Sequence, residues 1–272
     1  MPPNFSWGRS HLQENHFSLH PRRLNREFQM FREMQCVTID GRRVVRKVVE
    51  ETPVAVFVNG RHLTTVILSP GGFQDFITGY LYTEEIVRSA DEIESIRIED
   101  NRISVLTKNP FRRGSVKKTI LSGCGGSVSY IDTERLPAID SDLTVSITDL
   151  QAALAALRPS SPLDVVALMD DGRVITCAED LDRHNALDRV IGHGLRDGLD
   201  LSQITVLSTG TVTTEMVRKC LTAGIPVLVS TDLPTALAVD VARGGGLCLV
   251  GSVGTPEMAV FTHAERISGV KR

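Results

Sequence analysis

One cysteine has the surroundings that a reactive thiol needs. Cys124 occurs in LSGCGGSVSY (residues 121–130), where glycines flank it on both sides. Thiols attack as thiolates, which nearby cations stabilise. Four basic residues precede it on the same stretch: Arg112, Arg113, Lys117 and Lys118. The pattern fits a nucleophile or sulfur carrier. It fits equally a glycine-rich turn that holds a small residue, so both interpretations stay open.

The other cysteines look different. The chain has five cysteines, widely spaced and without a CxxC pair, which is typical of free thiols in a reducing compartment. A cytoplasmic protein is therefore expected. Cys177, Cys220 and Cys248 lie in apolar segments and are expected to be inert core residues. Because no second cysteine and no Hx3H or HxE pattern lies near Cys124 in the sequence, no metal site is expected.

A dense polar cluster, EDLDRHNALDRVIGHG, covers residues 179–194. Arg183, His184 and Asn185 precede a predicted helix, where Asn185 could be the N-cap and Asp188 would favour the first turn. His184 could carry a proton near neutral pH. The alternative is an ordinary helix-capping cluster with an exposed histidine.

Two glycine-bearing loops are candidates for binding an anion. The stretch VLSTGTVTTEM (206–216) predicts strand, loop and helix, whose first backbone N–H groups could hold a phosphate together with hydroxyls of Ser208, Thr209 and Thr211. RGGGLCLVGSVGTPEM (243–258) contains a second loop after a strand, where α/β proteins usually bind ligands. Tight connections with good helix capping are the alternative.

These candidates need elements to position them. Turn signals at residues 40–41, 59–60 and 100–101 divide residues 36–108 into strands, with a helix over residues 73–87. Residues 109–146 predict a long loop and a domain boundary. Beyond it, a hairpin over residues 164–180 turns at residues 171–172. Helices (147–158, 185–198, 213–224, 234–245) alternate with strands (203–209, 225–231, 247–254, 257–263), which predicts an α/β fold.

The expected architecture is α/β, in an α+β arrangement of two domains. A tail covers residues 1–35, and a mainly antiparallel β domain with one helix covers 36–140, with the Cys124 loop at its end. An α/β domain covers residues 141–272. The net charge of −3 and pI near 6.2 argue against a nucleic-acid binder. Neither a membrane span nor a secretory signal is expected.

Five stretches carry a resemblance to a known family: ETPVAVFVNG, SPGGFQDFITGYLYTEEIV, EDLDRHNALDRVIG, TTEMVRKCLTAGIPVLVSTDLPTALAVDVA and LCLVGSVGTPEMAVFTHAERI. From about residue 50 to 268 the chain resembles the formate dehydrogenase accessory sulfurtransferase (FdhD-like sulfur carrier) family, as a diverged member. The resemblance implies a cytidine deaminase-like α/β sandwich in the C-terminal half and a homodimer.

The resemblance also implies a function. Cys124 aligns with the first cysteine of the family's CxxC motif, so it would accept sulfur from a cysteine desulfurase as a persulfide. The acceptor would be the molybdenum cofactor in its bis(molybdopterin guanine dinucleotide) form, for formate dehydrogenase or a related molybdoenzyme, with guanine nucleotide as a surrogate ligand. The implied catalytic residues are Cys124 and His184. The implied cofactor-binding residues are Arg183, Asn185, Ser208, Thr209, Gly210, Ser252, Val253, Gly254, Thr255, Pro256 and Glu257.

The chain departs from the family pattern at several positions. Ser127 replaces the second cysteine, Asp182 replaces a glycine, and Asp164 lies near a usual histidine. Gly210 and Gly254 stand where arginines are usual, and losing two cations weakens a pyrophosphate site. One cysteine suffices to carry a persulfide. The serine at position 127 therefore removes only the second thiol, which could resolve the persulfide as a disulfide or relay its sulfur within the motif. The alternative is a diverged, non-catalytic binding protein for the molybdenum cofactor, a guanine nucleotide or a partner oxidoreductase.

Overall fold

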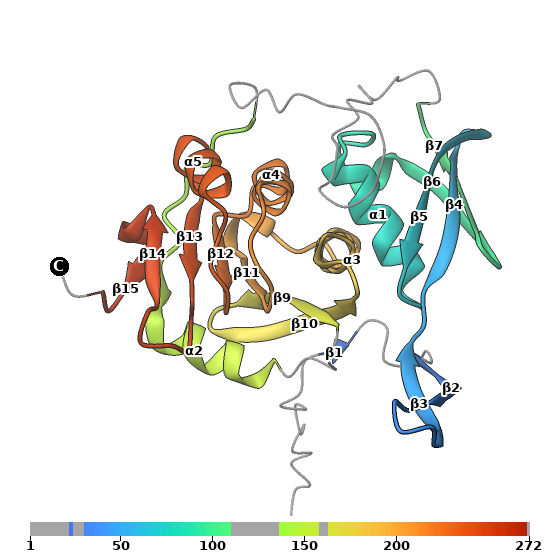
Figure 1. Cartoon of the computed structure of the whole chain (residues 1–272). Coiled ribbons are helices and arrows are strands. Elements are labelled where there is room, and N and C mark those ends of the chain that lie inside the picture. Colours follow the sequence, from blue (N-terminus) through green and yellow to red (C-terminus); the bar gives the residue numbers. More distant parts are fainter. Residues whose placement is uncertain (1–21, 24–29, 110–135, 158–162, 271–272) are drawn as a thin grey trace, which may run out of the picture.

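The computed structural model describes residues 22–23, 30–109, 136–157 and 163–270. Helices and strands form stacked layers of a mixed α/β structure (Figure 1). The α/β class expected from the sequence is confirmed. The limits of the tail and of the two domains, and the cytidine deaminase-like description, stay predictions.

The N-terminal half contains a four-stranded sheet with the order β5-β4-β7-β6. Its strands are β4 (Thr52–Val58), β5 (Arg61–Leu68), β6 (Ile93–Glu99) and β7 (Arg102–Thr107). Asn59 and Gly60 have φ of 49° and 78°, the left-handed values that a type I′ hairpin requires. One helix, α1 (Phe73–Thr83), packs against this sheet through the buried side chains of Phe76, Ile77 and Leu81. The hairpins expected in this region are therefore confirmed, and the helix begins at Phe73 as predicted but ends at Thr83 rather than at residue 87.

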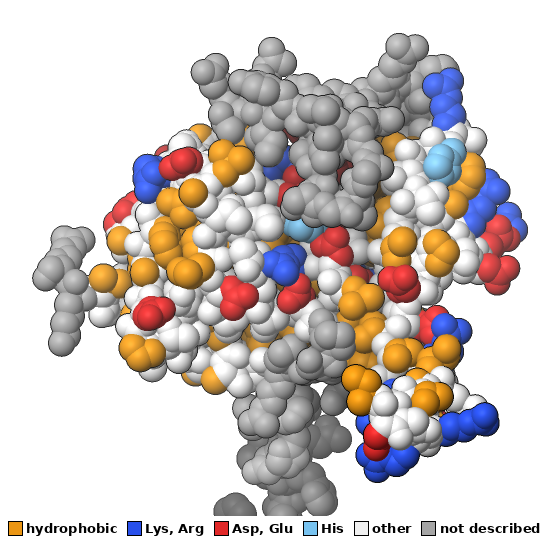
Figure 2. Space-filling view, in the orientation of Figure 1, with side chains coloured by type: hydrophobic (Ala, Val, Ile, Leu, Met, Phe, Trp, Pro, Cys, Tyr) orange, Lys and Arg blue, Asp and Glu red, His pale blue; other side chains and the backbone are white. Residues whose placement is uncertain are grey.

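A separate hairpin of β2 (Phe31–Val37) and β3 (Arg43–Val49) precedes that sheet. The turn lies at residues 40–41 as predicted, but the first strand begins at Phe31, inside the expected tail. Most of its side chains are exposed, and Figure 2 shows apolar and basic groups side by side on it, at the lower right. The exposed apolar residues are Met34, Val37, Ile39, Val45 and Val48.

The C-terminal half is built on a seven-stranded sheet with the order β1-β10-β9-β11-β12-β13-β14. The strands are β1 (Arg22–Arg23), β9 (Asp164–Asp170), β10 (Arg173–Asp180), β11 (Thr205–Ser208), β12 (Val227–Ser230), β13 (Cys248–Gly251) and β14 (Ala259–Thr262). Three neighbouring strands of this sheet, β11, β12 and β13, are parallel to one another. The predicted hairpin of β9 and β10 is confirmed, and β1 pairs with the outer side of β10.

Helices cover both faces of this sheet. They are α2 (Ile147–Ala156), α3 (Arg183–Arg196), α4 (Thr214–Ala223) and α5 (Ala236–Gly244). One apolar core lies between the sheet and α3, α4 and α5, and a second lies between the opposite face and α2 (Figure 1). Short elements complete the half: β8 (Val145–Ser146), η3 (Leu201–Gln203), η4 (Ala264–Arg266) and β15 (Ile267–Ser268). In the described ranges, no helix is both long and apolar enough to span a bilayer.

The two halves meet where α1 crosses α3. A Cβ on Gly79 would lie 1.9 Å from the carbonyl oxygen of Asp188, and a Cβ on Gly192 would lie 1.9 Å from that of Asp75. Both positions therefore need glycine because the helix backbones touch. This contact holds the start of α3, with its polar cluster, in a defined place beside the sheet.

Candidate functional site

The loops that follow β11, β12 and β13 lie together at one edge of the sheet. Because these strands are parallel neighbours, their carboxyl ends meet at the same edge. Backbone hydrogen bonds join the loops: Thr231 N–H donates to Ser208 O (3.2 Å) and Val253 N–H donates to Ser230 O (3.1 Å). The structure thus brings residues 208–210 and 252–257, which are far apart in the sequence, to one edge with a single strand between them.

The first residues of α3 contact this edge. Arg183 donates from Nε to Asp164 Oδ2 (2.9 Å) and from Nη1 to the carbonyl oxygen of Thr211 (2.6 Å). Arg183 thereby ties the start of α3 to the start of β9 and to the loop after β11. Three of the segments expected from the sequence to form a site therefore converge, and their ligand stays a prediction.

Asp182, rather than Asn185, caps α3. Its carboxylate accepts a hydrogen bond from the backbone N–H of His184 (2.8 Å). The helix begins two residues earlier than expected, which places Asn185 inside the first turn. Asn185 is buried, and its amide donates to the carbonyl of Ile67 (3.0 Å) at the end of β5. Its expected capping role is wrong, and its role in cofactor binding stays a prediction.

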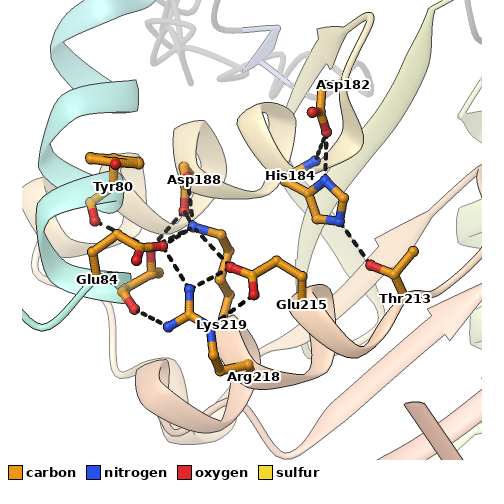
Figure 3. Close-up of polar contacts among 10 residues, drawn as sticks. Tyr80, Glu84, Asp182, His184, Asp188, Thr213, Glu215, Arg218 and Lys219 are labelled. Atoms are coloured by element: carbon orange, nitrogen blue, oxygen red, sulfur yellow. Dashed lines mark hydrogen bonds and ion pairs between the residues drawn. The ribbon is translucent and has the colours of Figure 1, made fainter. Parts of the chain in front are cut away.

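His184 stands between an acid and a hydroxyl. Its Nδ1 lies 2.6 Å from Asp182 Oδ1, and its Nε2 lies 2.8 Å from Thr213 Oγ1 (Figure 3). In the neutral imidazole, Nδ1–H donates to the carboxylate, so Nε2 accepts from the hydroxyl. Burial alone would raise the pKa of Asp182, but the hydrogen bonds with His184 and the charges of His184 and Arg183 together outweigh burial, so the pKa lies below its ordinary value. Nε2 is thus the ring nitrogen that faces away from the carboxylate and accepts a hydrogen bond.

Thr213 was missed by the sequence reasoning. It is the N-cap residue of α4, yet its hydroxyl makes no capping bond because it is engaged with His184. The pair Thr213-Thr214 at the start of the predicted helix was the available signal, but it indicated only that a threonine could cap the helix.

The predicted cofactor-binding residues differ in their access to solvent. Gly254, Thr255, Pro256 and Glu257 are exposed; Arg183 and Thr209 are half-buried; Asn185, Ser208, Gly210, Ser252 and Val253 are buried. The hydroxyl of Thr209 accepts from Val165 N–H (2.9 Å), and that of Thr255 donates to Ser252 O (2.8 Å). The outer part of the loop after β13 is thus the most accessible part of the predicted set.

A second polar group lies deeper, between α1, α3 and α4 (Figure 3). It consists of Glu84, Asp188, Glu215, Arg218 and Lys219, named here the ion cluster. Lys219 Nζ lies 2.9 Å from Asp188 Oδ2 and 3.1 Å from Glu84 Oε1. Arg218 pairs with both Glu84 and Glu215. Asp188, expected to favour the helix dipole, is instead a buried ion-pair partner.

The spacing of Glu215, Arg218 and Lys219 along α4 was a visible signal for this cluster. Residues three and four apart lie on one helical face. What the spacing could not reveal is that α1 and α3 bring two more carboxylates to that face.

Another missed residue is Arg189, which is fully buried on α3. It donates to the carbonyls of Ser69 and Gly71 and lies 3.0 Å from Asp180 Oδ2. Its Nε has no hydrogen-bond partner. Two of the sequence stretches that carry the resemblance, SPGG and DRHNALDR, therefore meet in a structural contact.

The described cysteines fall into two groups. Cys177, Cys220 and Cys248 are buried as expected, and Cys36 is exposed. Burial raises the pKa of the Cys220 thiol far above its ordinary value and raises the pKa of the Cys248 thiol to about 12, so neither is a thiolate at neutral pH. Cys124 lies outside the described residues. Within those residues no three His, Cys, Asp or Glu side chains are grouped to hold a metal ion, and the expectation about metals stays a prediction.

Comparison with known proteins gives consistent matches. The model of the FdhD/NarQ family matches residues 49–268. A protein named sulfur carrier protein FdhD from Methanothermobacter thermautotrophicus is 32% identical over 249 residues, which cover 88% of this chain and 99% of that protein. A protein of the same name from Brucella abortus is 33% identical over 242 residues, covering 82% of this chain and 90% of that one.

A solved structure is also similar. It is a protein from Desulfotalea psychrophila described as a formate dehydrogenase accessory protein. The TM-score is 0.71 at 25% sequence identity, over 87% of this chain and 98% of that chain. The similarity thus covers both halves of the fold described above.

Proposed function

Because the chain belongs to the FdhD/NarQ family, we propose that it is a sulfur carrier for a formate dehydrogenase or a related molybdoenzyme. The family match over residues 49–268 is the observation that carries the proposal. We expect the protein to act in the cytoplasm as a homodimer, with a cysteine desulfurase as the sulfur donor.

Cys124 is the proposed carrier. Its thiolate attacks the outer sulfur of the donor's persulfide, so a new S–S bond forms on Cys124 and the donor leaves as a thiolate. An acceptor that attacks the outer sulfur then regenerates the Cys124 thiolate. One cysteine is enough for both steps, so Ser127 does not prevent them. The burial of three other cysteines supports the assignment, because a buried thiol is poorly accessible to a donor, and burial also raises the pKa of Cys220 and Cys248.

The proposed binding site for the acceptor is the edge of the C-terminal sheet where the loops after β11, β12 and β13 meet, named here the loop edge. The acceptor is the molybdenum cofactor with its guanine dinucleotide ends. Hydroxyls and backbone amides of residues 208–210 and 252–257 meet there, which suits the sugar and base of a nucleotide. His184 is placed to exchange a proton through Nε2, which Asp182 orients from the other side of the ring. The proposal gives His184 the role of a proton carrier at this edge.

Mass spectrometry tests the carrier role directly. After incubation with a cysteine desulfurase and cysteine, the wild-type chain should gain sulfur, and Cys124→Ala should lose that gain. Cys36→Ala is the matched control, because Cys36 is an exposed thiol outside the proposed mechanism and its loss should leave the adduct unchanged. An unmodified wild-type chain would overturn the proposal.

Formate dehydrogenase activity in cells that lack their own carrier separates the two functions left open by the sequence. For a carrier, Cys124→Ala abolishes the activity that the wild-type chain restores. For a non-catalytic binding protein, the same variant restores activity fully.

A further inference from the structure

Arg183 is the cationic residue in the predicted cofactor-binding set. Whether its guanidinium is free or already paired therefore decides how strongly the site binds phosphate. A free guanidinium binds phosphate through two parallel hydrogen bonds. In this chain, two nitrogens of the Arg183 guanidinium already have partners in the fold, namely Asp164 Oδ2 and the carbonyl of Thr211. The positive charge at the start of α3 is thus compensated before any ligand arrives.

The Asp164–Arg183 pair is held tightly against the loop after β11. A Cβ on Gly210 would lie 2.8 Å from Asp164 Oδ1 and 2.9 Å from Arg183 Cζ, so the pair packs directly on the loop backbone. The side chains of Arg183 and Asp164 keep 27% and 22% of their exposure, respectively. The pair is therefore close enough to solvent to meet a ligand, and buried enough that salt screens it incompletely.

The neighbouring loops add negative charge. Asp232 and Glu257 are exposed, and the backbone carbonyl of Asp232 accepts from Ser252 N–H at the same edge. A phosphate that approached Arg183 would meet the Asp164 carboxylate next to it. Because like charges repel, phosphate binding would require displacement of that carboxylate.

We propose that Asp164 is a specificity-determining residue that withholds Arg183 from phosphate, so that the site selects the nucleoside part of its ligand and gains little from its phosphates. This inference rests on the proposed function, because it concerns the ligand of the same loop edge. It differs from the proposed function in what it predicts: a substitution that increases binding.

Calorimetric titration of the full chain with guanosine, GMP and GDP tests the inference. Wild type should bind the three compounds with dissociation constants within about threefold of one another. Asp164→Asn should bind GDP about tenfold more tightly, the size expected for one charge-assisted contact, and guanosine within about twofold of wild type. Asp164→Ser is a second variant with the same expectation, and a gain in affinity cannot come from misfolding.

Two control variants locate the effect. Asp240→Asn removes the same charge from an exposed pair on α5 and should leave GDP binding unchanged. Adding Arg183→Gln to Asp164→Asn should abolish the gain, because the gain requires the released guanidinium.

Several results would overturn the inference: no gain for GDP in either Asp164 variant, an equal gain in Asp240→Asn, or a gain that survives Arg183→Gln. Absence of binding by all three compounds in every variant would overturn it too. The persulfide measurement on Cys124 does not depend on these titrations, so failure of the sulfur-carrier proposal is recognised separately.

Discussion

Two polar groups lie along α3 and α4, one of them including Glu84 at the end of α1, and they differ in their access to solvent (Figure 3). In the ion cluster, the side chains of Lys219 and Asp188 are 3% and 2% exposed. At the start of α3, Asp182 keeps 47% of its exposure and His184 keeps 17%. Both groups are hydrogen-bonded, yet Lys219 and Asp188 are closed off from solvent whereas Asp182 is open to a ligand.

The comparison teaches that pairing alone does not identify a functional charge. Nearby carboxylates outweigh the effect of burial and raise the pKa of Lys219, so this amine stays charged. Burial raises the pKa of Tyr80, which lies against the cluster, to about 12, so its phenol stays neutral. Such groups keep one state at physiological pH and serve the fold. The half-buried group at the start of α3 can exchange a protein partner for a ligand.

The largest effect is expected from Lys219→Met. The change leaves the buried Asp188 and the half-buried Glu84 without the amine that they share, and removing one partner of a buried pair costs about 3–5 kcal/mol of unfolding free energy. Arg183→Gln, which breaks the half-exposed pair, should cost only about 1 kcal/mol. Urea unfolding of both variants measures the difference.

Lys47→Met on the exposed hairpin is the control, and it should change the free energy of unfolding by no more than about 0.5 kcal/mol. Should Lys219→Met lose no more stability than Arg183→Gln, the contrast between the two groups would be wrong.

A smaller effect is expected from Glu215→Gln, and it depends on pH. Burial alone would raise the pKa of Glu215, but the hydrogen bond from Arg218 and the charges of Lys219 and Arg218 outweigh it and lower the pKa. A carboxyl group with a lowered pKa adds stability at pH values above its unfolded-state pKa, near 4.5, and this stability is lost as pH falls through the folded-state pKa.

The free energy of unfolding of the wild type should therefore exceed that of Glu215→Gln by about 2 kcal/mol at pH 7. This gap should narrow at pH values below the unfolded-state pKa of the carboxyl group. Urea unfolding at a series of pH values measures the gap. A gap of constant size at every pH would show that the charge of Glu215 is not its cause.

The smallest effect on stability is expected from Asp182→Ser, which keeps a side-chain cap for α3. Asp182→Ala removes the cap and should cost about 1 kcal/mol more. Both variants remove the partner of His184 Nδ1, so both should lose the preference for the Nδ1–H form that Asp182 imposes.

Nitrogen-15 NMR of the neutral imidazole measures that preference. It distinguishes orientation of His184 from capping, because Asp182→Ser changes the first and spares the second. An unchanged tautomer in Asp182→Ser would mean that Thr213 alone orients the ring.

Much of the fold followed from local patterns. The Asn59-Gly60 and Asp171-Gly172 turns predicted their hairpins because few residues adopt positive φ, and Gly224 ends α4 at φ 71° as expected. Helix starts were less accurate. The sequence placed the start of α3 near Asn185, whereas Asp182 provides the cap, and α5 begins after Thr235 rather than at Pro234. Several residues could fill each cap, and tertiary contacts chose among them.

The site itself was only partly predictable. Sequence alone singled out Arg183, His184 and the loops after two strands, because hydroxyls, glycines and a titratable imidazole are visible as residue types. It also set apart Cys124 from the cysteines of apolar segments. Partners were not visible, since Asp164 and Arg183 are 19 residues apart and His184 and Thr213 are 29 apart.

Residue types and local spacing thus determined the α/β class, most of the elements and the candidates for chemistry. Only the tertiary structure decided which charged side chains are already paired within the protein. The reason is that the charge and the availability of a side chain depend on its burial and on the groups that distant segments bring beside it. For that reason the sequence could name Arg183 as a candidate cofactor-binding residue, whereas the packing of β9 against α3 decided that its guanidinium is already paired with Asp164.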